Sequence, residues 1–202
     1  SAFGSPMAEV VYHPVFEVPT GRLVGADAAP VAPTPSDAER AATVAGVVHR
    51  VLCDLSHGPA ATAGWWVRVR FGVAPLVDRI LAHELALATR NAPVPCGRLR
   101  VGAREADLSL ALAGGGVRHL LHGGLALDLE EVVGSRLTLA DLRSLQVVTV
   151  RVRVDGRPVD GPDHLERVRT VAALAEAIGA QVVAEGGDTD EHLELVQRAG
   201  IG

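Results

Sequence analysis

The hydrophobic and polar positions of this chain follow two periodic patterns that succeed one another. In the first, apolar residues occupy every second position; residues 147–154 (VVTVRVRV) are the clearest case, with valines on one side and Thr149, Arg151 and Arg153 on the other. In the second, apolar residues recur at every third or fourth position, as in residues 38–55. The first pattern is typical of strands and the second of amphipathic helices, so the sequence predicts an α/β protein.

The two patterns alternate from one end of the chain to the other. Residues 9–18 and 22–31 flank Pro-Thr-Gly and predict a hairpin. Further strands are predicted at residues 65–73, 98–103, 124–129, 147–154 and 181–186, and helices at residues 38–55, 74–91, 104–123, 161–180 and 188–197. This order favours a parallel sheet covered by helices, with right-handed crossovers. A doubly wound sheet and a (β/α) barrel both fit it, but no strand is followed by a glycine-rich nucleotide-binding motif.

Composition narrows the class of protein further. The 202 residues fit one domain, and with 48% hydrophobic but only 3% aromatic residues its core must consist of Ala, Val and Leu. The apolar runs are shorter than the roughly 20 residues of a membrane span. A net charge of −5 without a basic cluster argues against nucleic acid as a partner. Two cysteines do not form a disulfide framework, so we expect a cytoplasmic protein.

Two further features of the composition concern the start of the chain and its cations. Residues 1–6 (SAFGSP) are interpreted as an expression remnant ahead of Met7, which leaves residues 7–202 as a single domain. All 19 basic residues are arginine, and lysine is absent from the chain.

Several segments match, in order, the motifs of one known family. Residues 175–201 (AEAIGAQVVAEGGDTDEHLELVQRAGI) carry the most specific pattern, because the glycine, the V-V-A-E-G run and the following threonine keep their spacing. Further matches lie at residues 12–28, 67–76, 95–105 and 125–152. With these motifs the chain resembles the EAL domain family, the cyclic-di-GMP phosphodiesterases. The resemblance implies a TIM-like (β/α)8 barrel whose first strand is antiparallel, with its site at the carboxyl ends of the strands.

The family hydrolyses a phosphodiester with two divalent cations, which carboxylates and an asparagine hold. Mg²⁺ and Mn²⁺ require such oxygen ligands and not cationic groups. The positions that match the family's functional residues are Asp27, Arg70, Gly102, Asp128, Leu129, Arg151, Arg153 and Glu185.

Most of these positions have lost the residue type that the chemistry needs. Arg70 stands in place of the asparagine, Gly102 in place of a glutamate and Leu129 in place of an aspartate. The family's lysine matches Arg151, and the aspartate after it matches Arg153. The resemblance therefore implies a degenerate member in which these positions are vestigial.

Three acids are kept, and their surroundings decide what they can do. We expect Asp27, Asp128 and Glu185 to face a pocket together with Arg70 and Arg151. Two guanidinium groups oppose cation binding electrostatically, so neither Mg²⁺ nor Mn²⁺ is expected as a cofactor. We interpret the acids as partners of the arginines in an ion-pair network, and the domain as catalytically inactive.

Two classes of function remain, with residual phosphodiesterase activity as the least favoured third. The favoured one is a non-catalytic domain in signalling or regulation that binds another protein or itself, for example as a homodimer. The alternative is a cyclic-di-GMP receptor without turnover, whose ligand would contact Asp27, Arg70, Asp128, Arg151 and Glu185. The family's phosphate-binding arginine falls on Val31, which weighs against the receptor.

The end of the sequence carries one more expectation. The family continues beyond the segment that matches residues 175–201 to a final strand, so we predict a shortened barrel that lacks its last strand. Such a barrel leaves strand edges unpaired unless something covers them.

Overall fold

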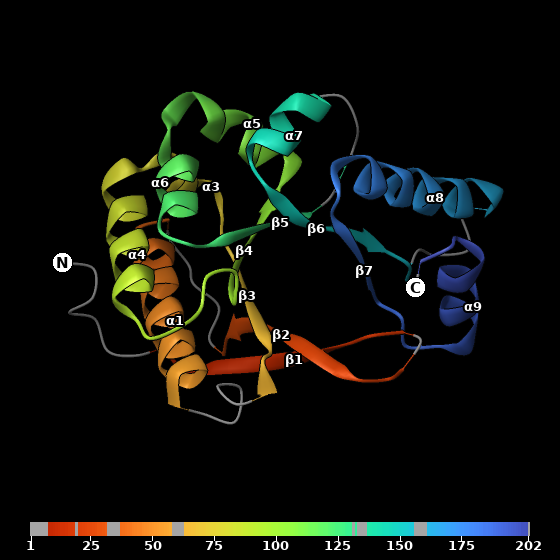
Figure 1. Ribbon diagram of the computed structural model, residues 1–202, viewed down its shortest axis with the longest axis horizontal. Coiled ribbons are helices and arrows are strands. Elements are labelled where there is room, and N and C mark those ends of the chain that lie inside the picture. The colour runs from red at the N-terminus through yellow and green to blue at the C-terminus, as the bar shows by residue number, and fades with distance from the viewer. Residues whose placement is uncertain are drawn as a thin grey trace.

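The computed structural model describes residues 8–18, 20–31, 37–57, 63–130, 132, 137–155 and 161–201. Within them, seven strands form one sheet whose spatial order equals the chain order (Figure 1). These strands are β1 (Val10–Phe16), β2 (Leu23–Pro30), β3 (Trp66–Arg70), β4 (Leu99–Arg104), β5 (Ala126–Glu130), β6 (Val147–Arg153) and β7 (Gln181–Glu185). Strand β1 is antiparallel to β2, and every later pair is parallel. The predicted antiparallel first strand is therefore confirmed.

Helices lie around the outside of the curved sheet (Figure 1). They are α1 (Asp37–His57), α3 (Val73–Val77), α4 (Arg79–Asn91), α5 (Glu105–Gly114), α6 (Gly116–His122), α7 (Leu139–Ser144), α8 (Gly161–Ile178) and α9 (Asp190–Arg198). In the described part of the chain, no helix is both long and apolar enough to cross a bilayer. The prediction for residues 1–6 concerns residues outside the described ones.

Two predicted helices are interrupted in the structure, each for a local reason. The helix predicted at residues 74–91 is divided at Asp78, whose side chain accepts hydrogen bonds from the backbone N–H groups of Ile80 and Leu81 and so starts α4. The helix predicted at residues 104–123 is divided at Gly115, where φ is 76° and the backbone is left-handed.

The hydrophobic core lies between the strands and the helices. Alternate residues of β3, β4, β5 and β6 point outward into it, and each is almost fully buried. They include Val67, Val69, Leu99, Val101, Leu127, Leu129, Val150 and Val152. Full burial of such a side chain stabilises the fold by about 1.5–3 kcal/mol. The core therefore fixes which face of each strand is left to form the interior of the curved sheet.

The interior face of the sheet is polar and charged. On β6, Thr149 and Arg151 alternate with the core valines and are buried, as the sequence pattern predicted. On β3, the inward residues are Trp66, Arg68 and Arg70, which alternate with Val67 and Val69. Ionic groups thus replace the aliphatic layers that fill the interior of most TIM barrels.

The sheet does not close on itself within the described residues. Strand β1 pairs with β2 and β7 pairs with β6, but no described residue pairs β1 with β7. A cleft of about 1540 Å³ opens there, lined by the β1–β2 hairpin, β7, α8 and α9. The arrangement is a mixed half-barrel, short of a full barrel as the sequence predicted.

One glycine in the sheet makes room for the largest interior side chain. A Cβ at Gly25 would overlap the ring of Trp66, the neighbouring residue on β3. We expect Gly25→Ala to lower the free energy of unfolding by about 1–3 kcal/mol, because overpacking displaces the ring. The control Gly72→Ala, which meets no atom within 4 Å, should change it by less than about 0.5 kcal/mol. Urea denaturation measures both, and equal effects would contradict this account.

Candidate functional site

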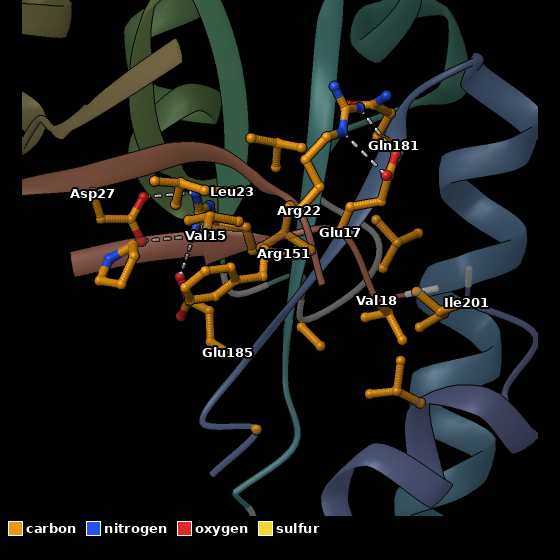
Figure 2. A pocket seen from close by; sticks show the side chains of 18 of the residues that line it. Val15, Glu17, Val18, Arg22, Leu23, Asp27, Arg151, Gln181, Glu185 and Ile201 are labelled. Atoms are coloured by element: carbon orange, nitrogen blue, oxygen red, sulfur yellow. Dashed lines mark hydrogen bonds and ion pairs between the residues drawn. The ribbon is translucent and has the colours of Figure 1, made fainter. Parts of the chain in front are cut away.

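A guanidinium group lies among the retained acids. Arg151 Nη1 is 2.9 Å from Asp27 Oδ2 and 2.9 Å from Glu185 Oε1, while Nη2 is 2.8 Å from Asp27 Oδ1. Both Nε and Nη2 lie 3.4 Å from Asp128 Oδ2. Figure 2 shows Arg151 between Asp27 and Glu185, which come from opposite sides of the cleft. The structure thus brings together four of the residues that the sequence indicated, from β2, β5, β6 and β7.

A second arginine, which the sequence analysis did not identify, completes this cluster. Arg68 Nε donates to Asp27 Oδ1 at 3.0 Å, and Arg68 Nη2 lies 3.5 Å from Glu185 Oε1. Arg68 Nη1 also pairs with Glu130. The Arg68 side chain is only 6% exposed. Its signal was present in the alternation of β3, since Trp66, Arg68 and Arg70 fall on one face.

Arg70 lies elsewhere than predicted. It is the last residue of β3, its side chain is 59% exposed, and it pairs with Glu130 Oε2 at 2.8 Å. The guanidinium group that lies beside Asp27 and Glu185 is therefore that of Arg68, two residues earlier on the same face of β3. Arg70 lies at the rim. The inward-facing arginine of β3 thus lies two residues before the position that matched the family motif.

Gly102 provides the space for the ion pair between Arg68 and Glu130. A Cβ at this position would overlap Glu130 Oε1 and would lie 3.0 Å from Arg68 Nη1. The absence of a side chain at position 102 is therefore a requirement of this packing.

Two further predicted positions do not reach the cluster. Leu129 lies on the outer face of β5, fully buried in the hydrophobic core. The Arg153 side chain is 67% exposed at the end of β6 and pairs with Asp155. Neither residue adds a group to the interior.

A further arginine, Arg100, contacts the cluster through Asp128. Arg100 on β4 stacks on Trp66, with the guanidinium carbon 4.1 Å from the ring centroid, and donates to Thr149 Oγ1 at 2.7 Å. Arg100 Nη1 lies 3.9 Å from Asp128 Oδ1. The Trp66 ring is thereby covered by a cation.

Burial and neighbouring charges shift the titration of these groups in opposite directions. Burial raises the pKa of Asp128 and of Glu130, although nearby arginines oppose the shift. Burial also lowers the pKa of Arg100. Burial alone would lower the pKa of Arg151, but Asp27, Asp128 and Glu185 together raise it. Arg151 therefore stays protonated throughout the physiological pH range.

The donors present do not fit a divalent cation. The carboxylates of Asp27, Asp128 and Glu185 are directed at Arg151, whose guanidinium occupies the space between them. A metal ion there would have to displace a buried cation with several charge-assisted hydrogen bonds. Among the described residues, no group of three or more His, Cys, Asp or Glu side chains is arranged to hold a metal ion.

Comparison with known proteins supports the fold. No family model matches the sequence, and no curated protein matches it. Among solved structures, the EAL domain of Mycobacterium smegmatis DcpA is similar with a TM-score of 0.79 and 22% identity, over 95% of this chain and 87% of that one. The PaMucR phosphodiesterase in complex with c-di-GMP has a TM-score of 0.79 and 16% identity, over 97% of this chain and 87% of that one. The FimX EAL domain from Pseudomonas aeruginosa bound to c-di-GMP has a TM-score of 0.76 and 15% identity, over 99% of this chain and 88% of that one.

These similarities extend over nearly the whole chain, so the protein has an EAL-like TIM-type fold. At such low identity they concern the fold alone.

Removal of Arg151 tests whether the ion pairs hold the interior together. Arg151→Met leaves Asp27, Asp128 and Glu185 without their main partner, so we expect the free energy of unfolding to fall by about 3–5 kcal/mol. The control Arg153→Met removes the exposed arginine on the same strand and should cost less than about 1 kcal/mol. Urea denaturation measures the free energy of unfolding of both variants. A similar decrease in the two would contradict the central role of Arg151.

The pKa shifts predict opposite pH dependences for two aspartates. The folded-state pKa of Asp128 is raised, so the stability difference between wild type and Asp128→Asn should decrease as the pH rises from the usual value of 3.8 through the raised value. Arg153 holds the pKa of the exposed Asp155 below 3.8. The difference between wild type and Asp155→Asn should therefore be lost as the pH falls through that lowered pKa. Unfolding by urea across the acidic to neutral range measures both, and slopes of the same sign would refute the assignment.

Proposed function

We propose that this protein is a non-catalytic EAL-like domain that acts in signalling or regulation by binding another protein. The observation that carries the proposal is the position of the Arg151 guanidinium, within 2.8–3.4 Å of carboxylate oxygens of Asp27, Asp128 and Glu185. These acids serve as structural ion-pair partners in this reading.

Metal-assisted hydrolysis needs carboxylates that are free to bind cations, and the carboxylates of this cluster are already paired with arginines. Two divalent cations require a set of oxygen donors that are free to bind them and a water that they activate. Here Asp27 is shared between Arg68 and Arg151, and Glu130 between Arg68 and Arg70. The carboxylates of Asp27, Asp128, Glu130 and Glu185 are paired with Arg68 and Arg151 inside, with Arg100 near Asp128 and with Arg70 at the rim, and these cations offset the negative charge that would attract a metal ion.

The open side of the sheet supports the second half of the proposal. Phe16 and Val11 on β1 are 55% and 44% exposed, and Leu193 on α9 is 42% exposed. Phe16 and Leu193 line the cleft between β1 and β7. Exposed apolar side chains gathered at one cleft mark a surface for protein contacts.

An assay of cyclic-di-GMP hydrolysis tests the absence of catalysis. We expect no linear dinucleotide when the protein is incubated with cyclic-di-GMP and Mg²⁺ or Mn²⁺, because Arg151 pairs with the carboxylates that would have to hold the cations. Chromatography of the products gives the readout, with the PaMucR phosphodiesterase as positive control. Formation of linear product above the protein-free blank would refute the proposal.

Titration calorimetry with the same nucleotide tests the competing receptor. No heat of binding is expected from cyclic-di-GMP or from MnCl₂ alone. Affinity for the nucleotide in the micromolar range or tighter, without hydrolysis, would replace protein binding by nucleotide binding as the function.

A further inference from the structure

Three arginines occupy the same position on three strands. Arg70, Arg104 and Arg153 are the last residues of β3, β4 and β6, and we call them the mouth arginines. Each lies two positions after a residue that faces the interior of the curved sheet, so alternation places all three on this face, at the carboxyl end of the sheet. Neighbouring strands are about 4.8 Å apart, so the three positions lie within about 15 Å along the sheet.

The mouth arginines are the exposed members of their ion pairs. The exposed fractions of the two side chains are 59% against 2% for Arg70–Glu130, 52% against 8% for Arg104–Asp107 and 67% against 34% for Arg153–Asp155. The carboxylates thus lie beneath the guanidinium groups. Solvent meets cations at this end of the sheet, although the net charge of the chain is −5.

A guanidinium group that holds one carboxylate can bind a second. Arginine has five N–H donors, and the contact of Arg70 with Glu130 is made by Nε. Glu130 also pairs with Arg68, so its charge is shared between two arginines. A carboxylate that approaches from solvent therefore finds both donors and a positive charge at Arg70.

An exposed aliphatic side chain accompanies the mouth arginines. Leu139, the first residue of α7, is 46% exposed. The backbone N–H of Leu137 donates to Glu105 Oε1 at 3.3 Å, so the start of α7 lies beside the start of α5, which directly follows Arg104 (Figure 1). In β3, β4, β5 and β6 the only aromatic residue is Trp66, at the opposite end of β3. These strands therefore offer no ring at the mouth on which a nucleotide base could stack.

This surface is separate from the cleft between β1 and β7. Neither the mouth arginines nor Leu139 line that cleft. Strands β3, β4, β5 and β6 each have a paired neighbour on both sides. The surface therefore does not depend on how the open side of the sheet is closed.

We propose that the mouth arginines and Leu139 bind an acidic segment of a partner protein. Asp or Glu side chains of the segment contact the guanidinium groups, and an aliphatic side chain packs on Leu139. This inference rests on the proposed protein-binding function and names the chemistry of the partner. Guanidinium groups bind carboxylates through planar, charge-assisted hydrogen bonds. Because these contacts lie at an exposed rim, they are screened by salt.

Selection of peptides tests the proposal without a known partner. A phage library of random peptides is selected on the wild-type protein, and the enriched peptides are synthesised and titrated by calorimetry. The test variant Arg70→Gln/Arg153→Gln removes two mouth arginines. The matched control Arg50→Gln/Arg90→Gln removes two exposed arginines of α1 and α4, so both variants have the same net charge.

The peptides and the variants have defined expected results. The enriched peptides should carry several Asp or Glu residues and an aliphatic residue, and their affinity should fall as the NaCl concentration rises. Binding should be at least about tenfold weaker to the test variant and within about twofold of wild type to the control. Neutral or basic peptides, equal affinity for the two variants, or no enriched peptide would overturn the proposal.

A second measurement keeps the test decisive if the test variant fails to fold, as judged by circular dichroism. The enriched peptides should then shift the NMR signals of the Nε–H groups of Arg70, Arg104 and Arg153 in the wild-type protein and leave those of Arg50 and Arg90 unchanged. Shifts at the latter two, or none at the mouth arginines, would contradict the assignment.

Two further outcomes would replace the partner. Binding of cyclic-di-GMP that the test variant abolishes would overturn the proposal in favour of a nucleotide. A wild-type dimer that the test variant dissociates would overturn it in favour of a second copy of this chain.

The two proposals fail separately. Linear dinucleotide in the hydrolysis assay would remove the claim of inactivity, while binding of acidic peptides at the mouth could still be measured. Peptides that bind the test variant and the control equally would remove the mouth as the docking surface and leave the protein-binding function in place.

Discussion

The contact of one arginine with three carboxylates is the interaction on which the interior of this protein depends. Arg151 joins residues of β2, β5 and β7 across the curved sheet, so it connects strands that are not neighbours. Charges inside a protein are tolerated only when they are paired and hydrogen-bonded. The remaining interior follows from this constraint: Arg68 balances Glu130, and Arg100 is held by Trp66 and Thr149.

Much of the fold could be predicted from the sequence because its signals are local. The alternation on β6 and the helical periodicity each depend on a few neighbouring residues, and the antiparallel first strand followed from motif order. The helix break at Asp78 was not predicted, because the helical periodicity continues past it and only the cap formed by its side chain interrupts the helix. The glycine run at residues 114–116 was a sign of weakness in the helix predicted at residues 104–123, and that helix is divided there, at Gly115.

The candidate site was predicted less completely, for a different physical reason. Asp27, Asp128, Arg151 and Glu185 were identified by motif position, and they do meet. Arg68 and Glu130 escaped notice because their role depends on partners far away in the sequence, on other strands. Motif matching compares a residue with its counterpart in a family, whereas an ion-pair network is defined by which side chains meet in space.

The glycine at position 102 has a consequence for the evolution of this site. The volume that a side chain would need there is filled by the Arg68–Glu130 pair, so a larger residue does not fit while both partners remain. Any substitution that replaces this pair or the Arg151 contacts by another kind of site would have to change several interior positions at once, because each single change buries an unpaired charge. The network therefore resists stepwise replacement of its members.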